Sequence, residues 1–198
     1  MSRLGLLGGS FNPIHNGHIY LANIVKEELN LDKILIIPSN ITPNKNCKDF
    51  VPNEDRLNMC KLSIEEKTDF EILDYEINKT QISYTILTIE YLREKYKSDE
   101  FYLIIGSDMF LSFDKWYRYK DILKEVILVF MLRSDEDINK INDQINKLSK
   151  YGTIRFIEIQ PYIVSSTEIR EKIKKCENFS CYLPEKVVQY IRLKKLYQ

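Results

Sequence analysis

The chain has 198 residues, of which 44% are hydrophobic, and its 29 basic side chains are balanced by 29 acidic ones. This length is typical of a single domain that can bury a sizeable core, so we expect one domain over residues 1–198. The balanced charge provides no overall field that would attract nucleic acid or a membrane surface, and no apolar stretch approaches the length of a membrane span. We therefore expect no nucleic-acid or membrane partner, and any bound anion must be held by local groups.

The first predicted elements are a short buried strand over residues 3–7, a turn that begins with Gly8-Gly9-Ser10, and a helix over about residues 18–29. Apolar residues recur at three and four positions in the last segment, which is typical of a helix. Such a turn leaves backbone N–H groups free, and the helix N-terminus adds partial positive charge, so we expect the turn to bind an anion. Gly8 and Gly9 have no Cβ, which allows a ligand to approach the main chain closely.

Both histidines of the chain, His15 and His18, lie in this turn. Imidazole is close to neutral at physiological pH, and it can hydrogen-bond a phosphate or become charged beside one. Two other interpretations stay open, because single histidines are often satisfied surface or core residues and a pair of them is half of a metal site. The metal site is the weaker alternative, since the chain has no third histidine and no cysteine near the turn. We expect no protein-bound metal there.

Further apolar runs and helical patterns alternate along the rest of the chain. Strands are predicted over residues 33–38, 70–73, 101–105, 126–130 and 153–159, and helices over about 54–66, 84–96, 119–124, 135–150, 166–175 and 184–196. Asn53 and Ser83 are expected to be N-caps, and Pro184 is expected at the first position of the last helix. The alternation predicts an α/β fold, which is a Rossmann-like doubly wound, mostly parallel sheet with helices on both faces.

The four cysteines, Cys47, Cys60, Cys176 and Cys181, form no Cys-x-x-Cys pair. In a chain of this size that usage predicts free thiols in a reducing compartment rather than a disulfide framework or a zinc site. We therefore expect a cytoplasmic protein.

Ligands of such a sheet bind beyond the carboxyl ends of the strands. The unusual polar segments of this chain all follow predicted strands, and this agreement predicts one composite site. The segments are Gly8 to His18, Ser39 to Lys45, Gly106 to Trp116, Arg133, and Ser165 to Arg170.

The segment from Ser165 to Arg170 has two interpretations. Ser165 and Glu168 have the spacing of a capping box, which needs no ligand. Three hydroxyls and the N–H groups at one helix start, with an arginine one turn later, would also bind phosphate. The pattern alone does not decide between them.

Three other features have a structural interpretation beside the functional one. Gly106-Ser107-Asp108 after a strand is most often a turn and a cap. Trp116, the only tryptophan, stands beside Tyr117 in a cluster that is ordinarily core or interface, although an exposed indole can also stack on an aromatic ring. Lys45 alone would be a solvated loop charge.

The turn resembles the signature of the nucleotidyltransferase superfamily, Gly-x-Phe-x-Pro-x-His-x-Gly-His. It is complete here as Gly9-Ser10-Phe11-Asn12-Pro13-Ile14-His15-Asn16-Gly17-His18. Over nearly its whole length the chain is similar to bacterial nicotinate-nucleotide adenylyltransferase. The further matching pieces are Ile37-Pro38-Ser39-Asn40 with Pro43 and Lys45, Asp55-Arg56-Leu57, Ser83-Tyr84-Thr85, Gly106-Ser107-Asp108 with Trp116, Ser165 to Arg170, and Leu183-Pro184-Glu185 through Tyr190-Ile191.

Small departures concern three positions. Asn44 and Asp55 stand where that family commonly has histidine. Gln81-Ile82 stands just before Ser83, where the family's sequence usually contains a glycine. These departures leave the inferred chemistry unchanged, and they weaken mainly the assignment of the residues around Lys45.

The resemblance implies that ATP and nicotinate mononucleotide react to give deamido-NAD and pyrophosphate, with Mg²⁺ bridging phosphate oxygens. The mononucleotide's own phosphate attacks the α-phosphate of ATP, so the protein supplies no nucleophile. The sequence agrees, because it has no evident Ser-His-Asp or Cys-His arrangement. Catalysis would then depend on positioning and on neutralising the charge that develops.

The resemblance also implies roles for individual residues. His15, His18 and Arg170 are the expected catalytic residues, with His18 on the reacting phosphate. The nicotinate nucleotide would be bound by Thr85, Trp116 and the backbone at Tyr117, with Lys45 and Arg133 as weaker candidates for its phosphate. ATP would be bound by Gly8, Gly9, Ser10, Phe11, His15, His18, Asp108 (at a ribose or the metal), Ser166, Thr167 and Arg170.

Three rival functions are retained. Phosphopantetheine adenylyltransferase and cytidylyltransferases share the His-x-Gly-His turn, but they would not need Trp116 after Gly-Ser-Asp or the Ser83-Tyr84-Thr85 sequence. A non-catalytic nucleotide-binding regulator is the rival of another class, and loss of either histidine or of Arg170 would favour it; none of them is lost. The oligomeric state stays open, a homo-oligomer included.

Overall fold

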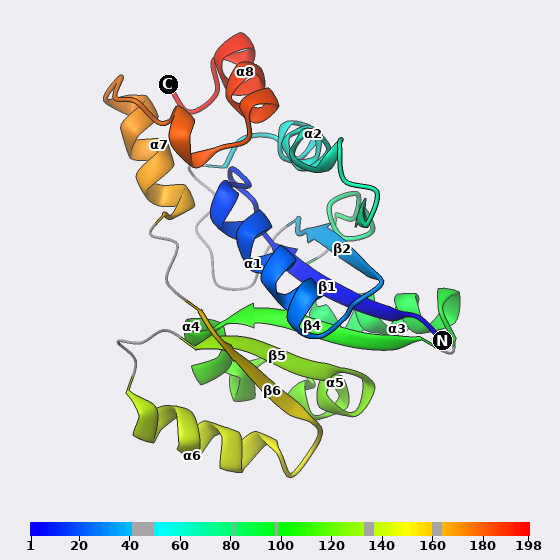
Figure 1. Ribbon diagram of the computed structural model, residues 1–198. Helices are drawn as coiled ribbons and strands as arrows, with labels where there is room; N and C mark the ends of the chain where they lie inside the picture. The colour runs from blue at the N-terminus through cyan, green and yellow to red at the C-terminus, as the bar shows by residue number, and fades with distance from the viewer. Residues whose placement is uncertain (41–49, 81, 98, 133–136, 160–163) are drawn as a thin grey trace. The chain divides into compact units, whose positions relative to one another are not determined.

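The computed structural model describes residues 1–40, 50–80, 82–97, 99–132, 137–159 and 164–198 (Figure 1). Its strands are β1 (Arg3–Gly9), β2 (Lys33–Pro38), β3 (Phe70–Ile72), β4 (Glu100–Gly106), β5 (Ile127–Leu132) and β6 (Ile154–Glu158). Its helices are α1 (Asn16–Glu28), α2 (Asn53–Ile64), α3 (Thr85–Lys95), α4 (Ser107–Leu111), α5 (Tyr119–Glu125), α6 (Ile138–Leu148), α7 (Ser166–Lys174) and α8 (Glu185–Lys194), with short 3-10 helices η2 (Phe113–Lys115) and η3 (Ser180–Tyr182). Within these residues no helix combines the length and the apolar character needed to cross a bilayer.

The six strands form one parallel sheet in the order β3-β2-β1-β4-β5-β6, which confirms the predicted Rossmann-like α/β class. In its register Leu6 of β1 lies opposite Leu103 of β4, and Phe130 of β5 lies opposite Phe156 of β6. The unbroken apolar runs of β4 and β5 are buried on both faces, as their composition predicts. Strand β6 forms an edge of the sheet and is largely exposed, in agreement with its alternating sequence.

Contacts divide the chain into two compact units, each assembled from three segments. Unit 1 contains Met1–Leu7, Val25–Ile34 and Tyr84–Pro161, and unit 2 contains Gly8–Ile24, Leu35–Ser83 and Tyr162–Gln198. The prediction that residues 1–198 form a single domain stays a prediction.

Unit 1 is built around β4 and β5. Phe110 of α4 stacks on Phe130 of β5 with ring centroids 3.8 Å apart, and Gln144 of α6 donates to the Phe110 carbonyl. On α3, Arg93 forms an ion pair with Glu125 of α5 at 3.1 Å. These contacts join α4 to β5, α6 to α4, and α3 to α5.

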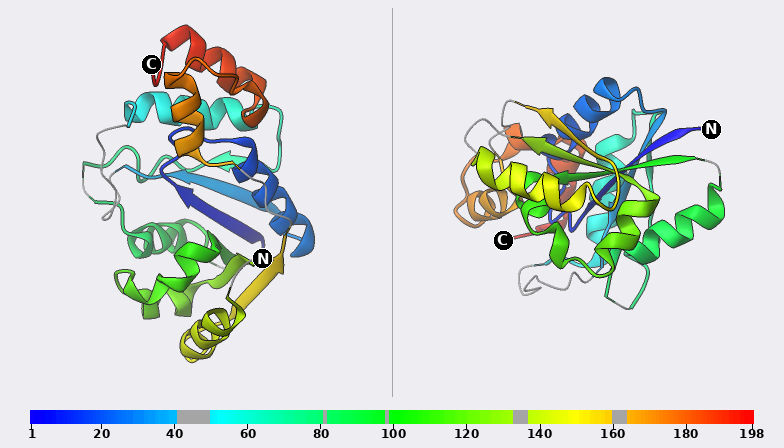
Figure 2. Two further views of the ribbon diagram at one scale, coloured as in Figure 1. Left: turned by 90° about the vertical axis from the view of Figure 1, so that its left-hand side faces the viewer. Right: turned by 90° about the horizontal axis from the view of Figure 1, so that it is seen from below.

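Unit 2 carries the glycine-rich turn and the C-terminal helices. Helix α8 lies beside α2 (Figure 2, left), where the Tyr190 hydroxyl donates to the Asp55 carboxylate and accepts from Asn58. The backbone N–H of Leu73, just after β3, donates to Ile36 of β2.

Three predicted cap positions are wrong, and tertiary contacts explain two of them. Pro52 is the N-cap of α2, and the Asn53 amide instead binds Asn40 and the Ile77 carbonyl. The Ser83 hydroxyl accepts from the backbone N–H of Asn40, so Tyr84 is the N-cap of α3. Pro184 is the N-cap of α8 rather than its first residue.

Candidate functional site

The turn between β1 and α1 is shaped by a close contact between Gly9 and the ring of Phe11. Phe11 has a left-handed backbone (φ 43°), which is uncommon for a residue other than glycine, and its side chain is only 2% exposed. A Cβ at Gly9 would lie 2.9 Å from Cε1 and Cζ of this ring, whereas a Cβ at Gly8 would meet nothing within 4 Å. Gly9 is therefore needed for packing, and Gly8 leaves the main chain open to a ligand.

Gly9→Ala should lower the free energy of unfolding by about 1–3 kcal/mol, the usual cost of overpacking, because the buried Phe11 ring has to move. Gly8→Ala is the matched control, and it should change stability by no more than about 0.5 kcal/mol. Urea unfolding of both variants checks the prediction. Equal losses would show that the contact with Phe11 does not decide the identity of residue 9.

The two predicted histidines lie against each other where the turn joins α1, with His15 just before the helix and His18 in its first turn. Their rings stack with centroids 3.6 Å apart, and the Phe11 ring meets His18 edge-on at 5.0 Å. The backbone N–H of His15 donates to Nδ1 of His18 at 3.2 Å. When it is neutral, His18 therefore carries its hydrogen on Nε2 and can donate from that atom.

His15 is held as a neutral ring. It is 7% exposed, and its Nδ1 is buried without a hydrogen-bond partner among the described residues. Burial lowers the pKa of His15 to about 4, against a smaller opposing effect of the Glu168 carboxylate. His15 therefore contributes a neutral ring behind His18 rather than a cation.

This burial predicts a pH dependence of stability. The unfolded chain takes up a proton on His15 below pH 6.5, and the folded chain only near pH 4. The free energy of unfolding is therefore unaffected by His15 above about pH 7, and it falls as the pH is lowered from 6.5 toward 4. At pH 5 the free energy of unfolding should be lower than at pH 7.5 by about 2 kcal/mol from this group. Urea unfolding of the wild type and of His15→Gln across this range isolates the effect. The same slope in both proteins would contradict it.

The start of α7 is both capped and joined to the turn. Ser165 and Glu168 form the predicted capping box, with Ser165 Oγ accepting from the Glu168 N–H at 3.2 Å. Ser166 Oγ donates to the Pro13 carbonyl, and Arg170 Nη1 donates to the Asn12 carbonyl, each at 2.9 Å. The cap confirms one of the two interpretations of this segment and leaves the other open.

The first N–H groups of α7, those of Ser166 and Thr167, have no partner within the helix because they belong to its first turn. Arg170 Nη2 also lies 3.2 Å from Thr167 Oγ1, which places the guanidinium over that turn. Within unit 2 the structure thus brings the histidine turn, the α7 N-terminus and Arg170 together. This arrangement can bind a phosphate, since N–H donors and a cation converge there.

Arg56 supports the turn, and the analysis of the sequence gave it no role beyond its place in the matching Asp55-Arg56-Leu57 segment. Its side chain is fully buried, and its guanidinium donates to the carbonyls of Ser10 and Ser39 and to the Asn53 side chain. A signal for this was present, because Arg56 shares the buried face of α2 with residues three, four, seven and eight positions later. The buried cation fixes the backbone at the start of the turn.

Three of the residues predicted to recognise the nicotinate nucleotide, Thr85, Trp116 and Tyr117, lie in unit 1. Thr85 is the first residue of α3, whose N-cap Tyr84 makes no side-chain cap hydrogen bond. The ring of Tyr84 contacts that of Tyr117 at 4.7 Å, and half-buried Trp116 packs on Phe113 at 4.8 Å. The structure thus brings the start of α3 to the segment with Trp116 and Tyr117.

Asp108 is exposed in the first turn of α4, also in unit 1. Lys45 and Arg133, the two weaker candidates for the mononucleotide phosphate, lie outside the described residues.

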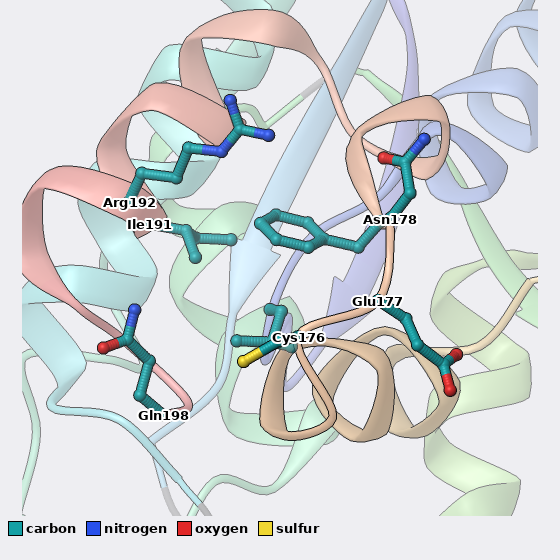
Figure 3. Close-up of a pocket in the computed structure, with 8 residues that line it drawn as sticks. Cys176, Glu177, Asn178, Ile191, Arg192 and Gln198 are labelled. Carbon is teal, nitrogen blue, oxygen red and sulfur yellow. The ribbon is translucent and has the colours of Figure 1, made fainter.

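A cavity of about 410 Å³ beside α7 and α8 contains none of the predicted site residues (Figure 3). It is lined by Ile173, Cys176, Glu177, Asn178, Phe179, Ile191, Arg192 and Gln198.

Comparison with known proteins decides the family. A family model described as cytidylyltransferase-like matches residues 6–172. A Clostridium tetani protein named "Probable nicotinate-nucleotide adenylyltransferase" is 37% identical over 100% of both chains, and one of the same name from Caldicellulosiruptor saccharolyticus is 37% identical over 99% of both. The chain belongs to the nicotinate-nucleotide adenylyltransferase family.

Solved structures show that the fold of this adenylyltransferase family member also occurs in a distant protein. Plasmodium falciparum nicotinic acid mononucleotide adenylyltransferase, in structures complexed with APC and with NaAD, matches with a TM-score of 0.78 at 18% identity. The match covers 100% of this chain and 98% of the other.

Proposed function

We propose that this chain transfers the AMP group of ATP to nicotinate mononucleotide and releases deamido-NAD and pyrophosphate, a step of NAD biosynthesis. The observation that supports the proposal is the arrangement in unit 2, where hydrogen bonds join the histidine pair, the α7 N-terminus and Arg170 around one turn. The names of the close relatives supply the acceptor. No protein nucleophile is required.

In the proposed reaction a phosphate oxygen of nicotinate mononucleotide attacks the α-phosphorus of ATP. A new P–O bond forms, the bond from the α-phosphorus to the bridging oxygen of the β-phosphate breaks, and pyrophosphate leaves with that oxygen. The enzyme lowers the barrier by aligning the two phosphates and by neutralising the charge that develops on their oxygens.

His18 is the proposed donor to the reacting phosphate, because its Nδ1 is occupied by the His15 N–H and its ring hydrogen is on Nε2. The pyrophosphate would be bound by Arg170 and by the backbone N–H groups of Ser166 and Thr167. The Ser166 hydroxyl has a different task, since its hydrogen is donated to Pro13. Gly8 to Phe11 would bring their main chain against the nucleotide.

The acceptor would be recognised by the cluster in unit 1. The first N–H groups of α3 and the Thr85 hydroxyl are donors, and the N-cap Tyr84 makes no side-chain cap hydrogen bond to them. Such donors suit the carboxylate of nicotinate, and the Trp116 indole suits its ring.

Mg²⁺ accompanies ATP in this proposal. Among the residues that the structure describes, no group of three or more His, Cys, Asp or Glu side chains could hold a metal ion. Asp108, exposed in the first turn of α4, is the candidate protein contact for an ion carried by the substrate phosphates, because Mg²⁺ is commonly bound by phosphates and one or two carboxylates. The ion would neutralise charge on the phosphate oxygens.

The test is pyrophosphate release from Mg-ATP with nicotinate mononucleotide, phosphopantetheine or glycerol phosphate as the acceptor, the last also with CTP. We expect release with nicotinate mononucleotide. Release only with another acceptor would favour the phosphopantetheine or cytidylyl rival, and release with none would favour the nucleotide-binding regulator. A cytoplasmic location and an oligomeric state, homo-oligomer included, stay predictions.

A further inference from the structure

Asn12 is a residue of the turn that accepts hydrogen bonds from three other segments of unit 2. It is 1% exposed, and its backbone carbonyl accepts from Arg170 Nη1 at 2.9 Å. Its side-chain Oδ1 accepts from the backbone N–H of Val51 at 3.3 Å and from the Tyr197 hydroxyl at 2.9 Å. Because an N–H group must face an acceptor, the Val51 contact also fixes which end of the Asn12 amide is the oxygen.

Tyr197 reaches Asn12 because the chain reverses after α8. Lys195 and Tyr197 both have left-handed backbones (φ 52° and 65°), and the Leu196 N–H returns to the Ile191 carbonyl at 3.1 Å. The reversal places Leu196 and Tyr197 inside the protein, 9% and 8% exposed, while Gln198 lines the cavity of Figure 3. Burial raises the pKa of the Tyr197 hydroxyl, so it keeps its proton and donates to Asn12.

We propose that Tyr197 is a positioning residue, whose hydroxyl sets the geometry of the histidine turn and of Arg170 through Asn12. This inference rests on the proposed function. Three groups depend on the position of Asn12: the His15–His18 pair three to six residues later, the Pro13 carbonyl that accepts from Ser166, and Arg170 itself. Removal of the Tyr197 hydroxyl would therefore weaken the positioning of both the histidine pair and Arg170.

The variant that tests this is Tyr197→Phe, which keeps the ring and removes only the hydroxyl. Tyr190→Phe is the matched control, because the Tyr190 hydroxyl is also hydrogen-bonded within unit 2, but to Asp55 and Asn58 and not to the turn. Tyr197→Phe should lower kcat for adenylyl transfer about tenfold and change KM for ATP by less than about threefold, since small misplacement affects the transition state more than ground-state binding. Tyr190→Phe should leave kcat unchanged.

Histidine NMR provides a readout that does not require activity. The chain has only two histidines, so ring ¹⁵N spectra report His15 and His18 alone. Tyr197→Phe should shift both sets of signals and Tyr190→Phe neither. A double variant, Asn12→Ala with Tyr197→Phe, should be no slower than Asn12→Ala by itself, because the hydroxyl acts through that amide.

The outcomes separate the two proposals. If the wild type releases no pyrophosphate with nicotinate mononucleotide, the proposed function is overturned, and the histidine spectra alone decide whether Tyr197 positions the turn. Unshifted spectra in Tyr197→Phe would overturn the positioning role. An equal loss of kcat in Tyr190→Phe would overturn it as well, because the effect would then be one of general stability.

Discussion

His18→Ala should lower kcat by roughly 10²–10³, the usual effect of removing one donor from developing transition-state charge. The reason is specific to one ring atom. His18 Nδ1 is occupied by the His15 N–H, so Nε2 is the donor that the reacting phosphate would lose. Stability should change little, because His18 is half-exposed in the first turn of α1 and contributes little to the core.

Two amide variants separate the acceptor at His18 Nδ1 from the donor at Nε2. In His18→Asn the side-chain oxygen can still accept from the His15 N–H, but the donor at the Nε2 position is lost, so kcat should fall as in the alanine variant. In His18→Gln the amide nitrogen can replace that donor, and part of the rate should return. Steady-state kinetics with thermal melts checks this, and wild-type turnover by His18→Asn would remove His18 from the proposed mechanism.

Nicotinate mononucleotide should be preferred over nicotinamide mononucleotide by roughly 10⁴ in kcat/KM, the ratio that a site with matched polar groups can reach. The two acceptors differ only in a carboxylate against a carboxamide. The uncapped start of α3 and the Thr85 hydroxyl present donors, which suit the carboxylate, whereas an amide would point its NH₂ group at them. Both acceptors are compared with Mg-ATP under the same conditions.

Variants at two positions of α3 and at Trp116 test whether this preference comes from the donors or from the stacking ring. Thr85→Val should reduce the preference, and Thr88→Val, on the same helix but 2% exposed, should retain it. Trp116→Ala should weaken the binding of both acceptors equally, because the indole would stack on either ring. Equal kcat/KM for the two mononucleotides would discard a donor-lined pocket and indicate an enzyme of dual specificity.

Local patterns were sufficient for much of this protein. The apolar runs of β4 and β5, the glycines before α1 and the Ser165–Glu168 spacing each depend on residues close in the chain, and the structure confirms the strands, the helix and the capping box. The histidine pair was identifiable for the same reason, because the two residues are only three positions apart in the chain.

Other features depend on contacts that no local pattern records. Asn53 and Ser83 have the composition of caps, but Asn40 offers each of them a partner from another segment. Burial decides the neutral state of His15, and a histidine in a polar turn gives no sign of burial by itself.

The sequence by itself determined the order of the strands and of the longer helices and brought the glycine-rich turn and the histidines together, because hydrophobic periodicity and turn chemistry act between near neighbours. Only the tertiary structure decided how that turn is held. Arg56 reaches it from α2, Arg170 from α7, and Tyr197 from 185 residues further along the chain. Hydrogen bonds over such separations arise when packing brings distant segments together, and they leave no periodic trace in the residues that make them.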